Sequence, residues 1–338
     1  MRSGHDPIWN GNVRPAGPRL TTPLPGAARG HGRAGGAALL LVAALSGAAC
    51  NALYYPVIRL VYDRADLPAS QIIHDASYDS IAADARQRLD LFLPTGSHWP
   101  VVVFVHGGSW TSGDRGLRIG GADVYGNIGR FLAGHGIGAA VISYRLLPDV
   151  DWSTQADDVA RAVGWIYRTI PVYGGDKNRI VLMGHSAGAQ LAVRAALDRE
   201  RLTRAGVPAH AIAGVIAVSG AGYDMADRET YELGNDPAFY AARFQRDASD
   251  MTWQTDASPV RFVSPDAPPF LIIYAGGETK PLQRQSHLLR DALHAAGVQT
   301  ELLESPGLTH TRIVPTLSRI DRPAGAAIVR FVEGVRTR

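Results

Sequence analysis

From about residue 88 onward, short continuous apolar segments alternate with segments whose apolar residues recur every three or four positions. The apolar segments are rich in Val, Ile and Leu, which is typical of strands buried on both faces. They are residues 88–94, 100–108, 136–144, 178–186, 213–220, 269–277 and 300–305. The other segments predict helices at 153–170, 187–200, 281–297 and 322–335, with Ser153 as the N-cap of the first. This alternation predicts an α/β fold with a mainly parallel central sheet and helices on both faces.

One stretch, residues 221–268, interrupts the alternation. It is rich in Asp, Tyr and Pro, and it is long for a connection between a strand and the next strand. Insertions of this length are often lids or pocket walls. We therefore predict a single domain over residues 51–338 that carries a small cap in this stretch.

The distribution of charge argues against a nucleic-acid partner. The formal net charge of +3 and the pI of about 9.1 reflect residues 1–36, which hold five Arg and one Asp. The remaining 37–338 carry 29 Lys and Arg against 30 Asp and Glu. A nearly neutral body without a basic run lacks the charge that phosphate binding needs.

Residues 1–50 have the features of a leader. An apolar run of about a dozen residues, AALLLVAALSGAAC, follows Arg29 and Arg33 and ends in small residues, as in a secretory signal. The run is shorter than the roughly 20 residues of a spanning helix. The single cysteine, Cys50, follows the small residues as in a bacterial lipobox, although Gly47 stands where Leu is usual. We expect an exported protein, periplasmic or membrane-anchored through lipidated Cys50; the alternatives are a cleaved signal with an incidental cysteine and a cytoplasmic protein with a disordered leader.

The strongest motif is GHSAG at Gly184–Gly188, which lies between a predicted strand and a predicted helix. In a nucleophile elbow the serine occupies a sharp turn at the end of a strand, and flanking glycines leave room for the strained backbone. The N-terminus of the following helix offers N–H groups to developing negative charge. The same letters can form an ordinary Gly/Ser turn, but the strand–turn–helix context favours Ser186 as a nucleophile.

A second motif, HGGSW, follows the apolar run VVVFV, where an oxyanion-hole loop is expected. Small residues let backbone N–H groups approach the carbonyl oxygen of a substrate. We interpret His106 as a structural residue that braces this loop. Trp110 is a candidate wall of an acyl pocket or a core residue, and Tyr223 of the predicted cap is a candidate for the alcohol side. The expected oxyanion donors are the N–H groups of Gly107, Gly108, Ser109 and Ala187.

Three segments together resemble a known family. HGGSW, SYRLLP (143–148) and YGGDKNRIVLMGHSAGAQLA (173–192) resemble the esterases of the α/β-hydrolase superfamily. The most similar groups are HGG-containing carboxylesterases, including feruloyl and acetyl esterases, kynurenine-formamidase-like enzymes and prenylcysteine methylesterases. The resemblance covers roughly residues 85–335. It implies the α/β-hydrolase fold and a triad in the chain order Ser, acid, His, with the acid after strand seven and the histidine after strand eight.

Carried onto this chain, the resemblance makes Ser186 the nucleophile and His310, in GLTHTRI after the last predicted strand, the base. His294 is excluded because it lies within a predicted helix. The acid in this family usually stands seven residues before a Gln–Ser pair, and counting back from Gln285 gives Glu278. Glu278 thus replaces the usual Asp, and its extra methylene requires the turn to lie further back.

We therefore predict a serine carboxylesterase that acts on a small-molecule ester through Ser186, Glu278 and His310. An arylformamidase-like amidase and a non-catalytic binding protein on the same fold are the alternatives. Asp158 is expected to brace the SYRLLP loop through Arg145, a structural role. The sequence contains neither Cys and His spacing typical of a metal site nor a phosphate-binding glycine loop, and no cofactor is expected.

Overall fold

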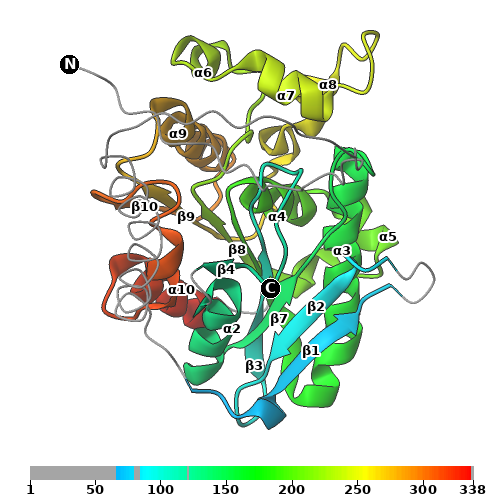
Figure 1. Ribbon diagram of the computed structural model, residues 1–338, viewed down its shortest axis with the longest axis vertical. Coiled ribbons are helices and arrows are strands. Elements are labelled where there is room, and N and C mark those ends of the chain that lie inside the picture. The colour runs from blue at the N-terminus through cyan, green and yellow to red at the C-terminus, as the bar shows by residue number, and fades with distance from the viewer. Residues whose placement is uncertain (1–65, 80–83, 120–121, 336–338) are drawn as a thin grey trace, which may run out of the picture. The chain divides into compact units, whose positions relative to one another are not determined.

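An eight-stranded sheet in the order β1-β2-β6-β3-β7-β8-β9-β10 forms the centre of the described domain (Figure 1). Strand β2 runs antiparallel to both of its neighbours, and the other neighbouring strands pair in parallel. The predicted, mainly parallel sheet is therefore confirmed. The strands are β1 Ile72–Ser77, β2 Arg88–Phe92, β3 Trp99–Val105, β6 Gly138–Ile142, β7 Gly175–His185, β8 Ile212–Val218, β9 Phe270–Ala275 and β10 Thr300–Ser305, with a separate pair, β4 Arg118–Ile119 and β5 Ala122–Asp123.

The computed structural model describes residues 66–79, 84–119 and 122–335. All of them belong to one compact unit, Tyr54–Arg338. The predicted leader and Cys50 lie outside the described residues. Within the described ranges, no helix is both long enough and apolar enough to cross a bilayer.

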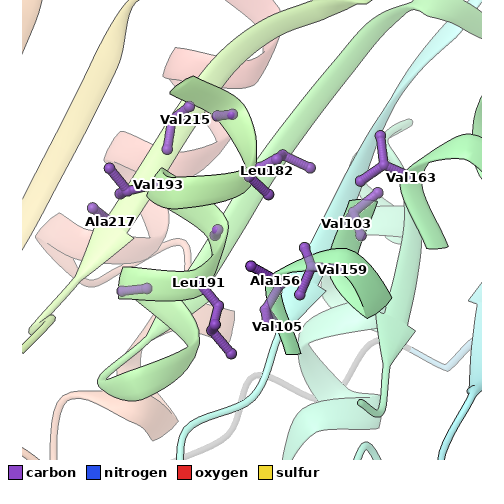
Figure 2. Packing of buried hydrophobic residues seen from close by; sticks show 14 of the residues in the cluster. Val103, Val105, Ala156, Val159, Val163, Leu182, Leu191, Val193, Val215 and Ala217 are labelled. Atoms are coloured by element: carbon purple, nitrogen blue, oxygen red, sulfur yellow. The ribbon is translucent and has the colours of Figure 1, made fainter. Parts of the chain in front are cut away.

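Helices cover both faces of the sheet, as predicted. On one face the apolar residues of α3, α4 and α9 share a core cluster with alternate strand residues, and on the other face those of α2 and α10 do so. Strand β3 shows the alternation, since Val103 and Val105 belong to the first cluster and Phe104 to the second. Figure 2 shows the first cluster, where Val159 of α3 and Leu191 of α4 pack near these valines. These helices are α2 Val124–Gly134, α3 Trp152–Thr169, α4 Ala187–Leu197, α9 Lys280–Ala295 and α10 Pro323–Gly334.

The predicted N-cap of α3 is wrong. The helix begins at Trp152, and the Asp151 side chain accepts a hydrogen bond from the N–H of Thr154. Aspartate caps helices at least as well as serine does. Ser153 instead lies in the first turn, where its carbonyl and hydroxyl oxygens accept hydrogen bonds from Arg201.

Three short helices occupy the stretch between β8 and β9, where the cap is predicted. Figure 1 shows α6, α7 and α8 at one end of the sheet, beyond α4 and α9. Asp227 and Asp236 cap α6 and α7. The three are α6 Arg228–Glu232, α7 Pro237–Phe244 and α8 Trp253–Ala257. The remaining helical elements of the described residues are α5 Arg199–Arg204 and the 3-10 turns η1 Ala69–Gln71, η2 Ile170–Tyr173, η3 Ala209–Ala211, η4 Pro259–Phe262 and η5 Val314–Ser318.

Candidate active site

Ser186 occupies a sharp turn between β7 and α4. Its backbone has φ 56° and ψ −124°, a conformation that a non-glycine residue adopts only when its surroundings enforce it. The flanking glycines explain how the turn closes: a Cβ on Gly184 would lie 2.2 Å from the Gly188 carbonyl oxygen, and one on Gly188 would lie 2.2 Å from the Val105 carbonyl oxygen. The Ser186 N–H donates to the Val218 carbonyl oxygen at 3.0 Å, which fastens the turn to β8.

The structure brings Ser186, His310 and Glu278 together. His310 Nε2 lies 2.9 Å from Ser186 Oγ, and His310 Nδ1 lies 3.0 Å from Glu278 Oε2. The three residues follow β7, β10 and β9, whose carboxyl ends meet at one edge because these strands are parallel. The Glu278 side chain is 0% exposed, whereas that of His310 is 27% exposed.

This arrangement fixes the proton positions on the imidazole. An ionised carboxylate only accepts hydrogen bonds, so the contact with Glu278 requires the proton of neutral His310 to be on Nδ1. Nε2 then presents its lone pair to the Ser186 hydroxyl, which can donate to it. The residue before Glu278 is bonded to the loop that carries His310, since the Gly277 N–H donates to the Leu308 carbonyl oxygen at 2.8 Å.

His185 holds the backbone of the His310 loop, a role that sequence reasoning did not identify. Its Nε2–H donates to the His310 carbonyl oxygen at 2.9 Å, and the two ring centroids are 4.9 Å apart. Burial, and then the nearby His310, lower the pKa of His185 to about 3, so the ring is neutral. A Cβ on Gly107 would lie 3.1 Å from His185 Nδ1, so the ring also contacts the loop after β3.

The loop after β3 lies against the nucleophile elbow because Val105 pairs with Gly184 in the parallel ladder. A Cβ on Gly107 would lie 3.1 Å from Ser186 Cβ. Among residues 66–79, 84–119 and 122–335, no acceptor engages the N–H groups of Gly107, Gly108 and Ser109. The N–H of Ala187, at the first position of α4, belongs to the helix-terminal groups that have no partner within a helix. All four predicted donors therefore lie on segments that meet beside Ser186.

His106 braces this loop, as expected from the sequence. Its Nδ1–H donates to the Gly107 carbonyl oxygen at 2.7 Å, and its ring stacks on Tyr144 with centroids 4.3 Å apart. The Tyr144 hydroxyl donates to the His106 carbonyl oxygen at 3.0 Å. Burial lowers the pKa of His106 to about 4, so this ring is neutral at physiological pH.

The two predicted pocket residues both lie in the interior. Trp110 is 1% exposed, and its Nε1–H donates to Gln190 Oε1 at 3.2 Å. Tyr223 is 0% exposed and packs so closely on Gly220 that a Cβ on this glycine would lie 1.9 Å from the tyrosine hydroxyl.

A further contact was missed by sequence reasoning: Arg243 Nε of the cap donates to the Ser109 carbonyl oxygen at 3.1 Å. No pattern in the sequence indicates that contact.

Comparison with known families gives a match over more than half of the chain. The BD-FAE family model matches residues 89–293. Esterase LipC of Mycobacterium tuberculosis is 32% identical over 237 residues, which cover 67% of this chain and 57% of LipC. The isoprenylcysteine alpha-carbonyl methylesterase ICME of Arabidopsis thaliana is 29% identical over 241 residues, which cover 67% of this chain and 54% of ICME. The chain thus spans about half the length of these curated relatives.

Solved structures share the fold. A truncated carbohydrate esterase from gut microbiota superposes with a TM-score of 0.66 at 20% identity, over 79% of this chain and 98% of that one. Esterase B of Lactobacillus rhamnosis superposes with a TM-score of 0.65 at 24% identity, over 88% of this chain and 93% of that one. Together with the strand order, these likenesses confirm the predicted α/β-hydrolase fold.

Proposed function

This chain belongs to the BD-FAE family, and from that premise we propose that it is a serine carboxylesterase. The observation that carries the proposal is the continuous contact from Ser186 Oγ through the His310 imidazole to the buried Glu278 carboxylate. The names of the relatives LipC, an esterase, and ICME, a methylesterase, support an ester as the substrate. Small-molecule esters are the expected substrate class.

In the acylation half of the proposed reaction, Ser186 Oγ attacks the ester carbonyl carbon while His310 Nε2 takes the hydroxyl proton. The negative charge that develops on the carbonyl oxygen is met by N–H groups of Gly107, Gly108, Ser109 and Ala187. Each such donor typically lowers the barrier by about 3 kcal/mol. The tetrahedral intermediate then collapses, the bond to the alkoxy oxygen breaks, and His310 Nε2–H protonates that oxygen so that it departs as the alcohol.

In the deacylation half, His310 Nε2 takes a proton from a water molecule that attacks the acyl-enzyme. The second tetrahedral intermediate releases the carboxylic acid, and the proton returns to Ser186 Oγ. Glu278 stabilises the imidazolium in both halves and keeps the imidazole oriented toward Ser186. The buried position of its side chain strengthens this interaction, because a low dielectric screens charge weakly.

The experiment is steady-state hydrolysis of 4-nitrophenyl acetate, butyrate and octanoate and of methyl ferulate, with Ser186→Ala as the test variant. We expect turnover by the wild type and a loss of about 10⁴-fold or more in kcat in the variant. Ser97→Ala is the matched control, because Ser97 is exposed in the turn before β3. Unchanged turnover in Ser186→Ala would remove Ser186 as the nucleophile. Turnover of N-formyl aryl amides without ester turnover would favour the amidase alternative.

A further inference from the structure

Arg243, in the last turn of α7, contacts the proposed oxyanion loop directly. Its Nε donates to the Ser109 carbonyl oxygen at 3.1 Å, and its Nη1 donates to the Phe239 carbonyl oxygen at 2.8 Å. The guanidinium also lies over the Phe239 ring, 3.6 Å from the centroid. Two hydrogen bonds and a stacking contact therefore fix the orientation of this side chain between the cap and the loop.

The charge of Arg243 is directed at backbone carbonyl oxygens. Within the part of the chain that the structure describes, no carboxylate lies at ion-pair distance from its guanidinium. Arg246, three residues on, differs: its side chain is 58% exposed, and its Nε lies 3.7 Å from Asp250 Oδ2. Hydrogen bonds with a charged donor are roughly twice as strong as neutral ones, so the Arg243 contact is a strong restraint on the peptide it holds.

The peptide that Arg243 holds lies in a strained segment. Ser109 and Trp110 have φ of 52° and 63°, and neither is a glycine. Left-handed backbone at such residues persists only where neighbouring groups enforce it. The Trp110 ring is packed against α7 as well, with its centroid 4.8 Å from that of Phe244 in an edge contact. Helix α7 therefore contacts both strained residues of the loop.

We propose that α7 positions the oxyanion loop for catalysis and that Arg243 is its main positioning residue. The inference rests on the proposed esterase function. The N–H groups of an oxyanion hole stabilise charge only in the transition state, and only when they are held close to the productive geometry. Arg243 holds the Ser109–Trp110 peptide, which directly follows the proposed donor N–H of Ser109. Loosening this peptide should therefore slow the chemical step while leaving ground-state substrate binding nearly unchanged.

The test compares Arg243→Ala and Arg243→Lys with Arg246→Ala on 4-nitrophenyl butyrate, with rates normalised to active sites titrated by a fluorophosphonate. We expect Arg243→Ala to lower kcat by on the order of 10- to 100-fold with KM changed less than about twofold. Arg243→Lys should recover part of the rate, because it retains a cationic donor on the same turn. Arg246→Ala should stay within about twofold of the wild type.

A second readout reports on the oxyanion itself. An aryl trifluoromethyl ketone adds to the nucleophilic serine and gives a hemiketal that carries an oxyanion. Its inhibition constant should rise in Arg243→Ala by the same factor by which kcat/KM falls, as expected for a transition-state analogue. A helix that serves only overall stability would reduce the titrated active fraction and leave the affinity of each remaining site unchanged.

The outcomes separate this inference from the proposed function. A wild type that neither hydrolyses esters nor reacts with the fluorophosphonate overturns the esterase proposal and, with it, the positioning role. An active wild type with unchanged kcat in Arg243→Ala overturns only the positioning role. An increase in KM confined to esters that carry a carboxylate also overturns it and assigns Arg243 to substrate binding.

Discussion

At the residue scale, the acid of the proposed triad is distinctive because it is a glutamate. The Glu278 side chain is 0% exposed, and its Oε2 lies 3.0 Å from Nδ1 of His310. Its other oxygen, Oε1, is buried without a hydrogen-bond partner among the described residues. Buried carboxylate oxygens usually have partners, and the partner that orients this carboxylate is His310 Nδ1.

Glu278→Asp and Glu278→Gln should therefore both slow catalysis, by different routes. Aspartate is one methylene shorter, which should lengthen the contact with Nδ1 and lower kcat by roughly 10- to 100-fold through misorientation. Glutamine keeps the length but can donate to Nδ1 and select the wrong tautomer, so we expect a loss nearer 10³- to 10⁴-fold. Steady-state kinetics on 4-nitrophenyl butyrate measures both, with exposed Glu200→Gln as the control. A Glu278→Gln enzyme within tenfold of the wild type would indicate another acid or a Ser–His dyad.

The sequence indicated the positions of the three triad residues but not the residues that hold them in place. Ser186, Glu278 and His310 each follow a predicted apolar strand, and parallel strands bring such positions to one edge of the sheet. His185 and Arg243 support the site through contacts with residues 125 and 134 positions away in the chain. Nothing local to either residue encodes those pairings, because they depend on how the loops pack.

At the scale of elements, helix α3 fixes the SYRLLP loop through the buried Asp158 carboxylate, and Gln155 Nε2 of the same helix donates to the Arg145 carbonyl oxygen at 3.0 Å. Asp158 Oδ2 accepts from Arg145 Nε at 2.8 Å and from the Arg145 backbone N–H at 3.1 Å. Its Oδ1 accepts from Arg145 Nη2 at 2.7 Å and from Gln87 Nε2 at 2.9 Å. The expected bracing of the loop by Asp158 is therefore confirmed, and Gln87 extends it to the residue before β2.

Removing the carboxylate of this pair should destabilise the fold. In Asp158→Ala, the Arg145 and Gln87 donors lose a buried partner, and breaking a buried ion pair typically costs about 3–5 kcal/mol in the free energy of unfolding. Glu200→Ala is the matched control, because the exposed pair of Glu200 with Arg204 should contribute less than about 1 kcal/mol. Urea denaturation followed by tryptophan fluorescence measures both variants. A loss below about 1 kcal/mol in Asp158→Ala would show that the loop is held by other contacts.

Some elements escaped prediction for physical reasons. Helix α2 contains Gly126 and Gly129, and glycine disfavours helices by about 1 kcal/mol relative to alanine. The structure explains both glycines, since a Cβ on Gly129 would lie 2.2 Å from Phe92 of β2 and one on Gly126 would lie 2.0 Å from the carboxylate of Asp123, the N-cap. Because the packing around these glycines depends on the fold, the local sequence does not predict the helix. Strand β1, at the sheet edge, is only partly buried and lacks the apolar run that identified the inner strands.

At the scale of the whole molecule, two neutral histidines are buried at the carboxyl ends of central strands. His106 follows β3 and His185 ends β7, and burial is the main cause that lowers the pKa of each, to about 4 and about 3. The hydrogen bond to the Gly107 carbonyl oxygen and the charge of Asp114 oppose this lowering of the His106 pKa, and the charges of Arg86 and Arg115 add to it. A sequence shows the two histidines but not their burial, so this property emerges only from the assembled fold.

Stability should therefore fall as the pH drops below the ordinary histidine pKa of 6.5. Between pH 6.5 and about 4.5 the unfolded chain binds protons at both positions and the folded chain does not. The free energy of unfolding then decreases toward acid by about 1.4 kcal/mol per pH unit for each histidine. Above pH 6.5 the two rings are neutral in the folded and in the unfolded chain, so the stability that is lost toward acid is fully present. Urea denaturation at half-unit pH intervals measures the slope.

The contribution of one buried ring can be isolated by substitution. His185→Gln keeps an amide N–H that can reach the His310 carbonyl oxygen but removes a titrating group. It should therefore reduce the pH dependence of the free energy of unfolding by about 1.4 kcal/mol per pH unit. His210→Gln is the control, because His210 is an exposed histidine in the 3-10 turn before β8. An unchanged slope in His185→Gln would mean that the ring is protonated in the folded protein.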